Sequence, residues 1–167
     1  MKSILLLLLA LIPHVGFSQQ STVPVQFKVL DEAQNLLRGM EIRLYKENVL
    51  VDEVCDAPTK VKLALDDSAF YTIEIALETF ITKRIVIDTE HLDEIKRKNQ
   101  LKFEVELHRE EDYKHLEAYQ EVFDYPAVMI EYDTLSNDFI YNEEYRINTR
   151  NAIERMLIQS KRGDVAF

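Results

Sequence analysis

The chain has 167 residues, a formal net charge of −10 at pH 7 and 47% hydrophobic residues, a composition that suits a folded protein with a sizeable core. This acidic balance excludes a protein that binds nucleic acid through its phosphates, because such contacts need a basic surface. The single cysteine, Cys55, excludes an intrachain disulfide framework, so burial must stabilise the fold.

Residues 1–18 are predicted to be a signal peptide. Lys2 gives a short positive start, nine apolar residues follow at 4–12, and the small residues Gly16 and Ser18 fit a cleavage site. Nine apolar residues are too few to cross a bilayer, since a spanning helix needs about 20. We therefore expect an exported protein, periplasmic or extracellular, without a transmembrane anchor and with its signal peptide removed near Ser18.

The first half of the mature chain alternates apolar and polar residues, as strands buried on one face do. Three strands are predicted from this pattern, at 23–29, 40–45 and 61–65, and a further strand at 49–54 is predicted after the turn at 46–48. Pro24, near the start of the first strand, suits an edge position because proline donates no hydrogen bond to a neighbour. Gly39, just before the second strand, can adopt a positive φ.

A hairpin is predicted at residues 70–88. Alternating apolar side chains occupy one face of its first strand, at Tyr71, Ile73, Ile75 and Leu77. After a turn at Thr79 and Phe80, residues 81–87 form the returning strand.

The spacing of the apolar residues then changes at residues 89–99. Acids come first in this segment and bases last, an order that complements the dipole of a helix, so a short surface helix is predicted. Alternation resumes at 101–107 and predicts a seventh strand. Seven short strands separated by turns indicate a mainly β fold, a seven-stranded antiparallel sandwich over residues 19–109.

The run at 35–45 and the strand at 70–75, followed by an aromatic residue and a paired strand, resemble a known family. It is the transthyretin-like, carboxypeptidase-regulatory-like sandwich of Bacteroidota envelope proteins, and the likeness extends over residues 23–108. The segments 58–59 and 79–80 lack the glycines that the family usually has there. The resemblance implies a structural or binding module with no catalytic residues.

Residues 110–167 form a predicted C-terminal extension of different composition. Between residues 110 and 145, eleven acids stand against one base, and six of the eight tyrosines lie in the same segment. Alternation at 127–132 predicts an added strand. Asn142 is placed to cap a terminal helix that ends at Gly163. The predicted apolar stripe of this helix consists of Tyr145, Ile153, Met156 and Leu157.

The acidic, tyrosine-rich segment supplies the candidate binding residues, which are Tyr119, Tyr125, Tyr132 and Tyr141. Tyrosines of this kind are typical hot spots of protein interfaces. They could also stack on sugar rings while carboxylates accept hydrogen bonds from sugar hydroxyls. Against the sugar hypothesis, a packed extension with a solvated acidic face explains the same composition, and we favour that explanation.

No catalytic residue, cofactor or metal is predicted. The acidic loop at 133–138 lacks the alternating ligands and central glycine of an EF-hand. His91, His108 and His115 do not have the spacing of metal ligands. We expect Cys55 to be a small, partly buried side chain, because no histidine is marked as its partner.

Together these features predict an exported, non-enzymatic envelope protein that acts as a protein-interaction or structural module. Open strand edges could accept a partner's strand, and the acidic extension would favour a basic partner. The partner is an envelope protein that the sequence does not identify. The alternative is a carbohydrate-binding module of β-sandwich fold.

Overall fold

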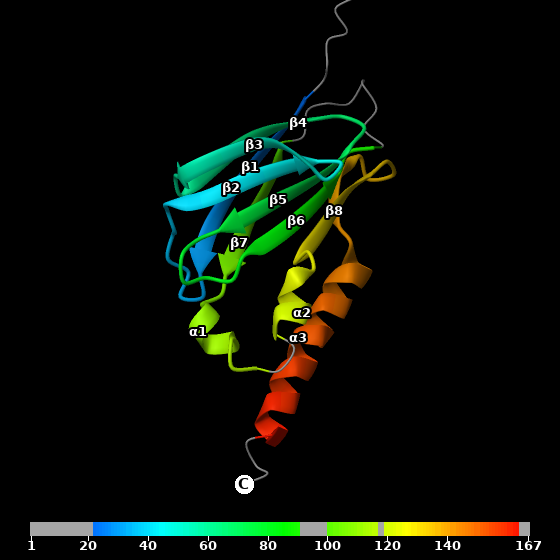
Figure 1. Ribbon diagram of the computed structural model, residues 1–167. Coiled ribbons are helices and arrows are strands. Elements are labelled where there is room, and N and C mark those ends of the chain that lie inside the picture. The colour runs from blue at the N-terminus through cyan, green and yellow to red at the C-terminus, as the bar shows by residue number, and fades with distance from the viewer. Residues whose placement is uncertain (1–21, 91–99, 117–118, 164–167) are drawn as a thin grey trace, which may run out of the picture.

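The structure, a computed structural model, describes residues 22–90, 100–116 and 119–163 (Figure 1). Side chains are described in these ranges except at 119–120 and 159–163. The predicted signal peptide lies outside the described residues, and so does the predicted helix at 89–99 beyond its first two residues.

Two sheets form the core of the fold, a three-stranded sheet in the order β4-β1-β7 and a six-stranded sheet in the order β3-β2-β5-β6-β8-β9. The strands of the smaller sheet are β1 (Thr22–Asp31), β4 (Lys60–Asp66) and β7 (Leu101–Leu107). The strands of the larger sheet are β2 (Met40–Lys46), β3 (Val49–Ala57), β5 (Phe70–Ala76), β6 (Lys83–Asp88), β8 (Val128–Asp133) and β9 (Asp138–Tyr141). The described helices are α1 (Glu110–Tyr113), α2 (Tyr119–Asp124) and α3 (Glu143–Gly163).

The mainly β class is confirmed, but the predicted seven-stranded, wholly antiparallel arrangement is wrong. The described chain has nine strands, and two pairs, β1·β7 and β6·β8, run parallel. Neither parallel pair is joined by a hairpin, so no tight turn forces an antiparallel orientation. The two strands beyond the predicted seven, β8 and β9, belong to the C-terminal extension.

The predicted edge position of Pro24 is also wrong, because β1 is the central strand of its sheet. On one side Pro24 is paired with Ala64 of β4. On the other side the pairing with β7 starts one residue later, at Val25↔Leu101. The proline therefore lies just beyond the paired part of β7, where β1 has a neighbour on one side only in the described part of the chain.

Large apolar side chains from the facing sheets fill the interior. Phe27 of β1 and Phe103 of β7 stack with their ring centroids 5.3 Å apart and their planes 8° from parallel. From the other sheet, Ile73 and Ile85 are almost fully buried. Burial of this apolar surface is the main favourable contribution to folding, since the chain has no disulfide.

The extension is built onto the larger sheet. β8 lies beside β6 in parallel register, with Ile130 opposite Ile87, and Ile130 belongs to the same core as the sandwich. This confirms the added strand predicted at 127–132. Because β8 pairs with the edge of β6, the extension is an integral part of the larger sheet and not a separate tail.

The predicted terminal helix is confirmed as α3, which runs alongside α2 (Figure 1). Asn142 caps it as expected, since the Tyr145 backbone N–H donates to Asn142 Oδ1 over 2.9 Å. Met156 is buried on its inner side, but Leu157, predicted in the apolar stripe, is 37% exposed. α3 packs on α2 and β8, and this packing leaves Leu157 partly exposed.

Candidate functional site

β3 forms one edge of the larger sheet, with β2 as its neighbour in the described structure. Consecutive apolar side chains on this strand are largely exposed: Val49 by 63%, Leu50 by 48% and Val51 by 51%. A strand edge presents backbone N–H and C=O groups that a further strand can bind. β3 therefore offers both the hydrogen-bonding groups and the apolar side chains of a strand-addition site.

The β3 edge is irregular and acidic. Leu44 of β2 is paired with Asp52, and the next residue, Tyr45, with Leu50, so Val51 is an extra residue in a bulge. The strand contains acids at 52, 53 and 56 and no base. Bulges and charged side chains both limit pairing at strand edges, and the charged residues of β3 are acids and not the lysines that are most common there.

Cys55 also lies on β3, and its side chain is exposed. The prediction of a partly buried cysteine is wrong, because β3 is an edge strand with most of its side chains in water.

A ladder of ion pairs on the outer face fixes β3 to the rest of the sheet. Arg43 of β2 donates to Glu53 of β3 and to Glu74 of β5, each over 3.0 Å. Glu74, itself 9% exposed, also accepts from Arg84 of β6 over 2.8 Å. The hydrogen bonds to Glu53 and Glu74 raise the pKa of Arg43 above its ordinary value. The edge is thus held in a defined position before any partner binds.

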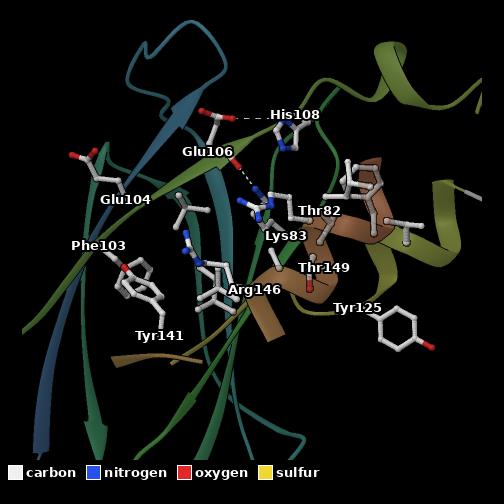
Figure 2. A pocket seen from close by; sticks show the side chains of 18 of the residues that line it. Thr82, Lys83, Phe103, Glu104, Glu106, His108, Tyr125, Tyr141, Arg146 and Thr149 are labelled. Carbon is white, nitrogen blue, oxygen red and sulfur yellow. Dashed lines mark hydrogen bonds and ion pairs between the residues drawn. The ribbon is translucent and has the colours of Figure 1, made fainter. Parts of the chain in front are cut away.

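A second candidate site is a cavity of about 290 Å³ between β6, β7 and the helices α2 and α3 (Figure 2). Its walls are mainly apolar, and the principal apolar side chains are Ile85, Phe103, Val105, Val122, Phe123 and Ile153. A cavity near 300 Å³ is at the small end of ligand sites.

Lys83 supplies a cationic group to this cavity. It is paired with Ile75 and therefore shares the core-facing side of β6 with Ile85. Its Nζ donates to the backbone oxygen of Glu106 on β7, so the side chain bridges the two sheets (Figure 2). Among the described residues, no carboxylate lies within ion-pair distance of Nζ. Burial lowers the pKa of the Lys83 ammonium, because an apolar environment disfavours the charged form.

The lowered pKa gives a prediction for stability. The unfolded chain titrates Lys83 near the ordinary value of 10.5, above the folded-state pKa, so between the two values the unfolded chain binds more protons. The free energy of unfolding therefore rises with pH in this window, by up to about 1.4 kcal/mol for each pH unit. Lys83→Met removes this contribution. We expect the stability of the wild type relative to Lys83→Met to rise from neutral pH towards pH 10.5. Urea unfolding at several pH values measures it, and a difference independent of pH would contradict the burial of the amine.

An aromatic cluster closes one end of the cavity. The His108 ring lies 5.4 Å from Tyr113 and 6.2 Å from Phe123, centroid to centroid. Glu32, from the β1–β2 connection, accepts from the Tyr113 hydroxyl over 3.2 Å and lies 2.7 Å from His108 Nδ1. Burial is also the main reason that the pKa of Tyr113 is raised. These contacts fix α1 and α2 against the sandwich.

The four predicted binding tyrosines do not form one surface. Tyr125 and Tyr141 both line the cavity and are 64% and 44% exposed. Tyr132 is buried against Phe139, and its hydroxyl donates to Asn137 Oδ1 over 2.5 Å. Tyr119 is the first residue of α2, and its side chain is outside the described set. A binding role for the tyrosines stays a prediction, with Tyr125 and Tyr141 placed to fill it.

The acidic loop after β8 is shaped by its own hydrogen bonds. The carboxylate of Asp133 accepts from the backbone N–H groups of Leu135 and Ser136, over 3.1 and 2.9 Å. Hydrogen bonds from Ser136 also lower the pKa of Asp133. Across the described ranges, no three histidine, cysteine or acidic side chains are grouped as metal ligands. The same ranges contain no helix long and apolar enough to span a bilayer.

No protein-family model and no curated protein matches the chain. Among solved structures, 3-chlorocatechol 1,2-dioxygenase from Rhodococcus opacus 1CP is similar at a TM-score of 0.38 and 8% identity, over 55% of this chain and 62% of that one. Catechol 1,2-dioxygenase from Acinetobacter sp. ADP1, inhibited by bound mercury, has a TM-score of 0.37 and 6% identity over 57% of this chain and 55% of that one. The pilus adhesin SpaC from Lactobacillus rhamnosus GG has a TM-score of 0.31 and 12% identity, over 54% of this chain and 14% of the adhesin. The chain thus spans less than two thirds of each, and its sites must be interpreted from its own residues.

Proposed function

We propose that this protein is an exported, non-enzymatic interaction module of the cell envelope that binds an extended segment of a partner protein along β3. The observation behind the proposal is the edge of β3, which has no neighbouring strand on its outer side among the described residues and carries three exposed apolar side chains. The resemblance of residues 23–108 to transthyretin-like envelope sandwiches supports it, because that family consists of structural and binding modules. Main-chain hydrogen bonds would supply affinity, and the side chains of β3 would supply specificity.

The charge of β3 indicates the kind of partner. With acids at 52, 53 and 56 and no base, β3 favours a segment that carries lysine or arginine among apolar residues. Pairing of β3 with β3 of a second copy would bring these acids together, which is unfavourable for like charges on adjacent strands. A basic partner strand therefore fits this edge better than a second copy does.

The test begins by crosslinking the protein in its own cells, identifying the captured protein and measuring its affinity for purified variants. Val51→Lys places a charge on the edge and is expected to weaken binding at least about tenfold, or ~1.4 kcal/mol. The control is Ile158→Lys on α3, where the wild-type side chain is equally exposed, 52% against 51%. This control should bind as the wild type does.

Salt is the second variable, and binding to the basic partner should weaken as salt is added. Equal binding by wild type and Val51→Lys, or a loss confined to Ile158→Lys, would contradict the proposed edge.

The carbohydrate-binding alternative rests on the exposed rings of Tyr125 and Tyr141. Saturable glycan binding that is lost in Tyr125→Ala and is insensitive to salt would favour that alternative.

A further inference from the structure

The position of Lys83 is unusual for a lysine. Its neighbours on the same face of β6, Ile85 and Ile87, are almost fully buried, and its pairing partner Ile75 is fully buried. A lysine at the edge of a core normally extends its ammonium group into water. Here the side chain crosses to β7 instead and ends at a backbone oxygen beside an apolar cavity.

Several other charged side chains around the cavity have partners of their own. Glu104 is paired with Lys28 over 2.9 Å, and the Glu106 carboxylate accepts a hydrogen bond from the neutral amide of Gln34 over 3.0 Å and lies 3.9 Å from His108 Nδ1.

On α3, the second wall of the cavity, Arg146 is paired with Glu143 over 2.8 Å, and Arg150 lies 4.0 Å from Glu154. Within the described part of the chain, Lys83 is thus the cation of this cavity with no carboxylate in ion-pair distance, and the charges of Glu106 and Glu32 act on it from farther away.

The Lys83 side chain is half-buried, and an ammonium partly withdrawn from water beside apolar walls is more stable when an anion neutralises it. An occupant must also present an apolar body to Phe103, Val105 and Ile153. We propose that the cavity binds a small apolar carboxylate, whose head group pairs with Lys83 and whose chain lies between β7 and α3. This ligand site is separate from the β3 edge and does not depend on the proposed function.

Octanoate is a suitable probe, and calorimetry or ligand-observed NMR on the mature full chain measures its binding. We expect saturable binding by the wild type. Lys83→Met should weaken octanoate binding at least about tenfold, because a charge-assisted contact is lost. Octanol has the same hydrocarbon chain as octanoate but no charge. The affinities of the wild type and of Lys83→Met for octanol should therefore agree within about twofold.

Matched variants separate the ligand site from general damage. Lys102→Met removes an exposed lysine of β7 that does not line the cavity and should leave octanoate binding unchanged. Ile153→Trp should fill the cavity from α3 and abolish binding of octanoate and octanol, with Lys83 left in place. Val51→Lys, on the separate edge, should bind octanoate normally.

Two results would overturn the proposal. One is the absence of saturable octanoate binding by the wild type. The other is octanoate binding that is equally strong in Lys83→Met or in Ile153→Trp, since the ligand would then lie elsewhere. If Lys83→Met does not fold, the Ile153→Trp variant decides alone.

Discussion

Replacing Ile130 with alanine is expected to lower the free energy of unfolding by about 2–5 kcal/mol, the range for truncation of a buried isoleucine. Ile130 belongs to the C-terminal extension, but it is 2% exposed and lies opposite Ile87 in the sandwich core. Its truncation should therefore cost as much as truncation of a central core residue. Urea unfolding followed by circular dichroism measures the change.

The control for this prediction is Ile147→Ala, the same substitution on α3 at a side chain that is 43% exposed. It should change stability by no more than about 0.5 kcal/mol. Equal effects of the two substitutions would show that the extension does not share the core of the sandwich.

Replacing Phe27 with alanine is expected to have the largest effect, a loss of about 3–5 kcal/mol. Phe27 is 1% exposed, and it stacks on Phe103 within the small sheet while facing the large one. Its loss would leave a cavity and remove an aromatic pair at once. Thermal and urea unfolding measure the change.

Phe70→Ala is the matched control for Phe27→Ala, because Phe70 is also at a strand position but is 38% exposed. Its truncation should cost less than about 1 kcal/mol. A Phe27→Ala protein as stable as Phe70→Ala would contradict the placement of β1 at the centre of the core.

The strands were largely predictable from the sequence because a half-buried strand repeats every two residues. The predicted strand at 101–107 matches β7, with Phe103 and Val105 facing inward. The order of strands was not predictable in this way. Alternation shows which side of a strand is buried, but it does not identify the neighbouring strand, and so the parallel pairs and the central position of β1 were missed.

Parts of the candidate sites carried a sequence pattern that could have located them. Lys83 alternates with Ile85 and Ile87, which predicts a cation on a core-facing position. Tyr132 follows Ile130 by two residues, so the alternation places it on the buried face of β8 and not on a binding surface. The exposure of residues 49–51 could not be predicted, because three successive apolar residues usually indicate a buried strand.

The shared core also affects how the proposed function should be tested. A chain that ends at Arg109 would lack β8 and the contribution of Ile130 to the core. Such a chain would confuse loss of a binding surface with loss of stability. Single substitutions at exposed positions, such as Val51 and Ile158, avoid this difficulty.

Binding along β3 is tested most directly by a photo-crosslinking amino acid placed at position 51 or at position 158 in the full-length protein in its own cells. If a partner strand adds to β3, position 51 should yield one discrete adduct whose crosslinked peptide is basic, and position 158 should yield none. An adduct from position 158 alone, or the same adducts from both positions, would contradict binding at the β3 edge.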